Sequence, residues 1–299
     1  MQFKHFYDLV KKSVNAWIDD YAPSMGAAIS YYTVFSIAPL LVIVIAVAGL
    51  VWGREAVQGQ IVDQLSGLMG KDGASGIQAL IESANKPAQG LVATAISIGI
   101  LVLGATTVFA ELQSSLDRIW QVPEKEKASG IWVTLRARLL SLGFILGLGF
   151  LLSVSLVFGA GVAAFGTWAN GLFPGWEVAL QVINMVISLG VATALFAMIF
   201  KLMPQAKVSW RDVWIGAAVT AVLFEVGKSL IGLYIGKSSV TSSFAAAGSL
   251  VVLLVWVYYS AQIFLLGAEF TWAYAHDHGS LAAARKDAPA IAAKPQGNQ

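Results

Sequence analysis

Six long apolar segments set the first limit on what this chain can fold into. They occupy residues 25–51, 91–115, 136–164, 178–203, 211–235 and 246–274. Each exceeds the roughly 20 residues that a helix needs to cross the hydrocarbon core of a bilayer. Because no water is present there, the backbone must satisfy its polar groups within each helix. The sequence therefore predicts an all-α, polytopic membrane protein with six transmembrane helices.

Composition agrees with a membrane protein. Hydrophobic residues make up 57% of the 299 positions and charged residues 12%, which is about half the charged share of a soluble domain. The chain has no cysteine and three histidines, so disulfides and cysteine-ligated metals are excluded. A net charge of +2 gives no broad nucleic-acid-binding surface. We expect no metal, no cofactor and no nucleic-acid partner, and membrane lipids as the surroundings.

Three segments outside the predicted spans have characters of their own. Residues 3–18 carry apolar side chains at helical spacing with lysines off that stripe, which is typical of a helix in the membrane interface. Packing on the protein's own surface is an equal alternative. Residues 52–90 are expected to hold an amphipathic helix and a second, short one. Residues 1–279 are expected to form one domain and residues 280–299 a disordered tail.

Lysine and arginine are distributed unequally between the two sides of the predicted spans. One side has three before the first span, five in residues 116–138, three in 201–211 and three in the tail, whereas the other side has four. Basic loops are retained in the cytoplasm. The distribution therefore predicts that both termini are cytoplasmic, which requires an even number of spans, and that residues 52–90 are periplasmic.

Polar residues in the outer half of the predicted spans form one candidate cluster. Glu225 and Lys228 lie three residues apart in the fifth span, so they can pair. Gln181 and Asn184 share a face of the fourth span at a similar depth. An ionisable group at mid-bilayer costs at least about 2.5 kcal/mol and usually faces away from lipid. The alternatives to a substrate pathway are a salt bridge that fixes helix register and hydrogen bonds between helices.

A second candidate cluster lies in the inner half. It combines Glu111 of the second span, Gln262 and Glu269 of the sixth, and Tyr31 and Ser36 of the first. Intramembrane carboxyl groups commonly mark substrate or proton pathways. The alternative is that the two carboxylates reach lipid headgroups at the cytoplasmic surface.

Proline and glycine suggest where the spans bend or approach one another. Pro39 lies inside the first span, where the missing N–H predicts a kink or local unwinding and makes it a candidate hinge. Gly232 and Gly236 in the fifth span, with Gly143 and Gly147 in the third, have the GxxxG spacing that allows close helix packing.

Several motifs resemble the BrkB/YihY family of bacterial inner-membrane proteins, once labelled ribonuclease BN. They are AISYYTVFSIAPL at 28–40, DRIWQV at 117–122, KLMP with VSW at 201–210, Phe224-Glu225 with Lys228, and the run 248–269. The chain departs from the family pattern at Asp117, where Asn is frequent, and at Phe244-Ala245, where Tyr-Gly is usual. The resemblance covers about residues 22–272 and implies six helices in the bacterial inner membrane.

The older ribonuclease label does not agree with the residues. RNA hydrolysis needs a metal cluster or an acid–base constellation open to water, and no cytoplasmic loop carries one. Asp117 with its neighbouring charges looks like a solvated turn. We therefore expect a protein that is not an enzyme. The favoured hypothesis is a transporter or flippase-like protein for a lipid or other amphiphile of the cell envelope. The alternative is a non-transporting scaffold for envelope assembly.

Overall fold

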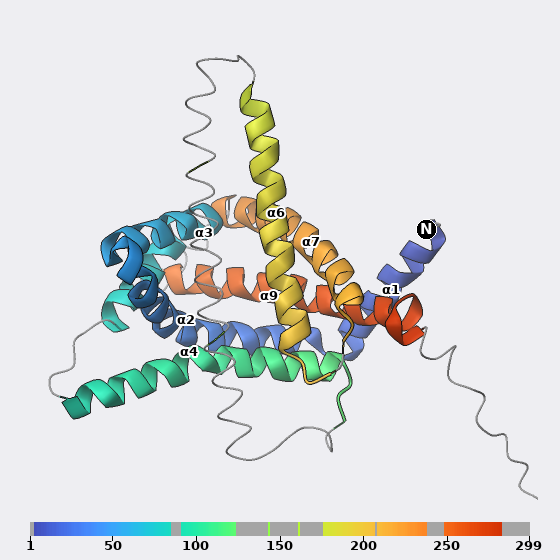
Figure 1. Ribbon diagram of the computed structural model, residues 1–299, viewed down its shortest axis with the longest axis horizontal. Coiled ribbons are helices and arrows are strands. Elements are labelled where there is room, and N and C mark those ends of the chain that lie inside the picture. The colour runs from blue at the N-terminus through green and yellow to red at the C-terminus, as the bar shows by residue number, and fades with distance from the viewer. Residues whose placement is uncertain are drawn as a thin grey trace, which may run out of the picture.

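A computed structural model describes residues 3–84, 91–123, 143, 161, 176–206, 208–237 and 248–282. In this part of the chain every regular element is a helix (Figure 1). The helices are α1 Phe3–Asp19, α2 Ala22–Trp52, α3 Arg54–Ala84, α4 Leu91–Ile119, α6 Trp176–Leu202, α7 Trp210–Lys237 and α9 Gly248–Asp277.

Five of the described helices, α2, α4, α6, α7 and α9, are long and apolar enough to cross a membrane. Their bounds agree within a few residues with five of the six predicted spans. The remaining predicted span, 136–164, lies outside the described residues except for Gly143 and Gly161, both of which are helical. The structure thus confirms an all-helical membrane protein, and the count of six stays a prediction.

Helix α9 lies at the centre of the bundle and packs against α1, α2, α3, α4 and α7. Helices α2, α4 and α9 lie side by side in Figure 1, while α6 runs across their direction and extends beyond them. The main core includes Phe200 of α6 and Phe264 of α9, whose ring centroids are 5.3 Å apart. Burial of such apolar and aromatic side chains against one another fixes the arrangement.

Helix α3 forms a packed layer across one end of the bundle. It follows α2 through Gly53, whose φ of 84° favours glycine. A second glycine, Gly70, has φ 80° and ψ 170° and divides α3 into two helical parts. This agrees with the two helices predicted within residues 52–90. Ile77 and Ile81 are buried in a cluster with side chains of α2 and α9. This loop is therefore a structural part of the bundle.

Helices α7 and α9 approach closely at two reciprocal contacts, and Gly227 of α7 also lies against Ile263 of α9. A Cβ added to Gly267 would overlap Thr220, and a Cβ added to Gly216 would overlap Thr271. Each threonine also donates a 2.7 Å hydrogen bond to the carbonyl four residues earlier in its own helix. The predicted packing at Gly232 is not seen within the described chain, where a Cβ there would meet nothing within 4 Å, and it stays a prediction.

Helix α2 stays helical through Pro39, so the local unwinding predicted there is not seen. The proline ring instead packs on Gly104 of α4, where an added Cβ would lie 3.0 Å from the Pro39 Cγ. The small residue on α4 accommodates the ring, and α2 and α4 stay in contact along this face.

Two buried aspartates tie the helix ends together near α1. Asp117, at the end of α4, accepts hydrogen bonds from the backbone N–H (2.6 Å) and side-chain amide (3.0 Å) of Gln205. Asp212, in the first turn of α7, accepts bonds from the N–H (3.0 Å) and Oγ (2.6 Å) of Ser280. Asp117 is 3% exposed, so its interpretation as a solvated turn residue was wrong. Ser280 is helical, which corrects the start of the predicted disordered tail; residues 283–299 lie outside the described part.

Candidate polar site between α2 and α9

Glu269 is a fully buried carboxyl group on α9. It has no exposed surface, and neither carboxyl oxygen has a hydrogen-bond partner among the described residues. Asp20, in the connection between α1 and α2, interacts with it through like charge and lies near hydrogen-bonding range, although no bond of normal geometry forms. Burial of a carboxyl without a partner is costly, so this group is the strongest departure from a purely structural span.

Gln262 lies two helical turns before Glu269 on the same face of α9. Its side-chain amide packs directly over Gly26 of α2, where an added Cβ would overlap the amide nitrogen. Both amide atoms are buried and lack a hydrogen-bond partner in the described part of the chain. Gly26 is therefore needed for space, since a larger residue would displace Gln262.

A third polar contact continues the same line between the two helices. Ser30, one turn after Gly26, donates a 3.0 Å hydrogen bond to the carbonyl of Leu254 in α9. We call Gly26, Ser30, Gln262 and Glu269 the α2–α9 seam. Ser30 and Gly26 were not singled out from the sequence as site residues, although their four-residue spacing places both on one face of α2.

The other residues of the predicted inner cluster do not join this seam. Ser36 is 1% exposed and its hydroxyl lacks a partner in the described chain, but six residues of helix turn it through about 240° relative to Ser30. Tyr31 is 57% exposed and packs against Phe35 in a tilted arrangement with ring centroids 4.9 Å apart. Glu111 is half-buried on α4.

The predicted outer cluster is only partly assembled. Glu225 and Lys228 form an ion pair of 2.7 Å, as expected, but their side chains are 46% and 32% exposed. Asn184 is exposed on α6 and makes no hydrogen bond within the described chain. The side chain of Gln181 lies outside what the structure describes. The pair fits a register-fixing salt bridge as well as it fits a pathway.

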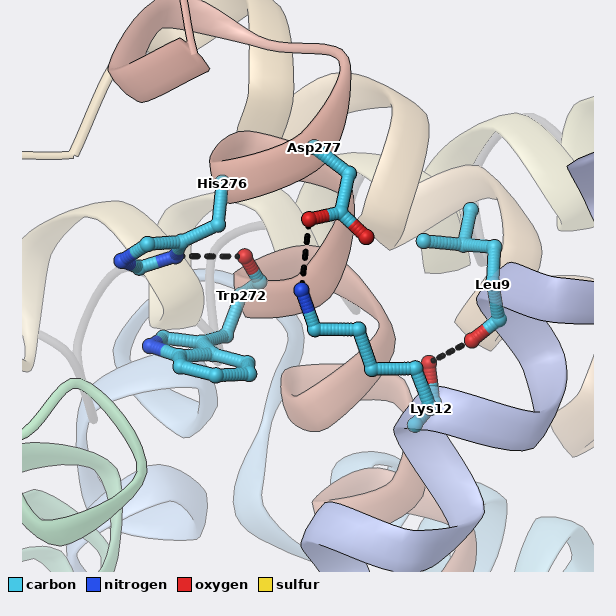
Figure 2. Close-up of polar contacts among 6 residues, drawn as sticks. Leu9, Lys12, Trp272, His276 and Asp277 are labelled. Atoms are coloured by element: carbon cyan, nitrogen blue, oxygen red, sulfur yellow. Dashed lines mark hydrogen bonds and ion pairs between the residues drawn. The ribbon is translucent and has the colours of Figure 1, made fainter. Parts of the chain in front are cut away.

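Two hollows lie at opposite ends of the bundle. A shallow groove of about 340 Å³ runs between α1 and Trp272, and a smaller pocket of about 130 Å³ lies between α2 and α3. Beside the groove, Lys12 of α1 pairs with Asp277 at 2.5 Å and lies 5.3 Å from the ring centroid of Trp272 (Figure 2). Neither hollow is lined by Glu225 or Glu269.

The fold and the seam define a polytopic helical membrane protein with buried polar groups at the contact of two spans. The chain belongs to the BrkB family, because the family model described as "Virulence factor BrkB" matches residues 14–292. This confirms the resemblance that the sequence motifs carried. No solved structure matches the chain.

Curated relatives carry the same general description. A "UPF0761 membrane protein" of Pseudomonas aeruginosa strain LESB58 is 26% identical over 278 residues, covering 89% of this chain and 63% of the relative. A namesake from Pseudoalteromonas translucida is 27% identical, covering 86% and 83%. One from Photobacterium profundum is 29% identical, covering 82% and 74%. The chain thus spans about 63% of the length of the Pseudomonas relative.

Proposed function

We propose that this protein is a transporter or flippase-like protein that moves a lipid or another amphiphile of the bacterial envelope. The observation that supports this function is the α2–α9 seam, above all the fully buried carboxyl of Glu269, which makes no hydrogen bond of normal geometry within the described chain. Polar groups buried at membrane depth between spans are the usual elements of a substrate or ion pathway.

The packing of the seam suggests how such a pathway would work. Gln262 and Gly26 are in direct contact, so passage of a headgroup requires α2 to separate from α9. Pro39 removes one backbone hydrogen bond of α2, which lowers the resistance of this helix to bending. The polar groups of the seam would then face the headgroup, while the acyl chains stay against the apolar outer surface of the bundle.

A lipid-translocation assay in vesicles containing the purified protein tests this function. The movement of fluorescent phospholipids between leaflets is measured for the wild type, Glu269→Gln and Gln262→Leu. We expect either substitution to slow translocation by at least about tenfold, equivalent to about 1.4 kcal/mol of barrier. Glu82→Gln, on the exposed surface of α3, is the matched control. Wild-type rates in both seam variants would contradict the mechanism.

A non-transporting scaffold is the second candidate, and the position of the hollows favours it. Of the two hollows in the described part of the chain, neither is lined by Glu225 or Glu269, as expected if the bundle only presents its surfaces. In that case, vesicles with the wild-type protein would move lipid no faster than protein-free vesicles. Glu269→Gln would also complement a deletion strain as well as the wild type does.

We further propose an inner-membrane location with both termini in the cytoplasm. The excess of Lys and Arg on one side of the spans supports this orientation. Green fluorescent protein fused after Gln299 should be fluorescent, and alkaline phosphatase fused there should be inactive. An active phosphatase fusion would reverse the orientation.

A further inference from the structure

The pocket between α2 and α3 combines apolar walls with one cation at its mouth. Its lining residues come from α2 and α3, which join at the end of the bundle opposite α1 (Figure 1). Its volume is about 130 Å³, and its lining residues are Val42, Ile45, Ala46, Arg54, Gln58 and Ile81. Four of the six are apolar, so the pocket suits a hydrocarbon segment attached to an anionic group.

Arg54 is the charged residue of this lining. It makes no ion pair and no hydrogen bond with any residue that the structure describes. Its side-chain stem packs beside Gly49, where an added Cβ would lie 2.7 Å from the Arg54 Cγ. The guanidinium group is planar and binds phosphate through two parallel N–H donors. Arg54 is exposed beside the apolar walls, so its guanidinium is available to an anionic group that lies against the pocket.

The walls of the pocket are continuous with apolar surface that faces outward. Ile45 and Ile81 are buried at its base, whereas Leu50 is 84% exposed. Leu50 lies one turn beyond Ala46 on the same side of α2. An acyl chain can thus enter sideways from the bilayer without crossing a polar surface.

The depth of the pocket also fits a lipid. Trp52, the last residue of α2, is 45% exposed, and exposed tryptophans at span ends lie at the level of the headgroups. Arg54 follows Trp52 by two residues. Val42 precedes Trp52 by ten residues, which places it about 15 Å deeper in the bilayer at the helical rise of about 1.5 Å per residue. The cation is therefore at headgroup level and the apolar lining at acyl-chain level.

We propose that this pocket binds an anionic phospholipid, with the phosphate on Arg54 and one acyl chain along Val42, Ala46 and Ile81. A water-soluble anion would leave the apolar lining unused, and a zwitterionic lipid would offer less net negative charge to the guanidinium. Such binding requires no transport activity, so its failure and the failure of the proposed function are distinguishable.

Photolabelling of the full-length protein in nanodiscs tests this site. The probes are phosphatidylglycerol and phosphatidylcholine with a diazirine near the start of one acyl chain, each added in trace amount to the same lipid mixture. After illumination, labelled peptides are quantified by mass spectrometry. We expect residues 42–58 to be labelled by phosphatidylglycerol about fivefold more than by phosphatidylcholine, the ratio for one arginine–headgroup contact. Equal labelling of this segment in the wild type would overturn the proposal.

Two variants separate the charge from the pocket. Arg54→Gln should reduce the labelling ratio to about one, whereas Lys71→Gln, an exposed lysine of α3 beyond Gly70, should leave it at the wild-type value. Ala46→Phe fills the lining and should remove labelling of residues 42–46 by both lipids. A fivefold ratio that persists in Arg54→Gln would overturn the assignment of the headgroup to that residue.

Discussion

Thr220 of α7 lies directly on the backbone of Gly267 in α9, and the same relationship is repeated with the helices exchanged at Thr271 and Gly216. Each threonine is four residues from the glycine of its own helix, and its hydroxyl bonds to that glycine's carbonyl. In lipid, such small-residue contacts replace the hydrophobic effect as the force that joins helices. Together with the contact of Gly227 on Ile263, these two contacts therefore set the distance between α7 and the central helix.

Gly267→Ala should lower the free energy of unfolding by about 1–3 kcal/mol, the usual cost of overpacking. This loss is measured as a lower melting temperature in detergent, determined from the fraction of protein that stays monodisperse in size-exclusion chromatography after heating. Gly232→Ala is the matched control, because a Cβ there meets no described atom. Addition of Thr220→Ala should recover part of the loss in Gly267→Ala. Equal melting temperatures for the two glycine variants would show that the contact is not tight.

Asp117 should be essential for the stability of the helix ends near α1. Asp117→Ala removes the acceptor of both hydrogen bonds from Gln205 and leaves a backbone N–H unpaired, which should cost about 1.5–3 kcal/mol. Gln205→Ala removes only the side-chain bond and should cost less. The double variant should melt close to Asp117→Ala, because the two residues share one interaction. Additive losses would mean that Asp117 acts mainly through other partners.

Features that depend on one helix alone could be predicted from the sequence, whereas contacts between helices could not. The spans follow from the lengths of apolar segments, and the Glu225–Lys228 pair follows from spacing within one helix. Spacing cannot identify the partner helix, so the GxxxG pattern predicts close packing at Gly232 and does not point to Gly216 or Gly267. The Gly-x-x-x-Thr spacing at both true contacts was a usable signal.

The candidate site shows the same limit. Glu269 and Gln262 are predictable as site residues because polar residues in a span are rare, but the contact of Gln262 with Gly26 joins positions more than 200 residues apart. The partnership of Asp117 with Gln205 spans 88 residues. Such contacts depend on how the hairpins pack, which local patterns do not encode, and residues 136–164 remain a prediction from hydropathy alone.

Helix α1 should be held to α9 by burial and only weakly by charge. Leu9 is 2% exposed and packs with Phe270 and Ala273, whereas the pair of Lys12 with Asp277 is more than a third exposed. Exposed ion pairs contribute about 0–1 kcal/mol, while Leu to Ala in a packed site costs about 2–5 kcal/mol. Leu9→Ala should therefore release α1, and Lys12→Gln should not.

The absence of native cysteine makes this release measurable. Ser13 is buried in the same contact, so Ser13→Cys should react slowly with a maleimide. Leu9→Ala in that background should speed the reaction at least tenfold, about the factor for 1.4 kcal/mol, and Lys12→Gln should change it little. A cysteine at the exposed Asn15 reports the unhindered rate. A faster reaction in Lys12→Gln than in Leu9→Ala would reverse the assignment.

Glu269→Gln should keep or raise the stability of the protein, unlike most substitutions of a fully buried residue. The carboxyl oxygens make no hydrogen bond of normal geometry within the described chain, and Asp20 lies close by. An amide of the same shape can still donate a hydrogen bond towards Asp20, and it cannot take up the charge that burial and Asp20 both oppose. Glu269→Ala should lower the melting temperature, since it leaves a cavity. In Asp20→Asn the gain from Glu269→Gln should shrink, because the repulsion is already gone. A melting temperature for Glu269→Gln as low as that for Glu269→Ala would show that the carboxylate has a stabilising partner, and the seam would then be a structural contact.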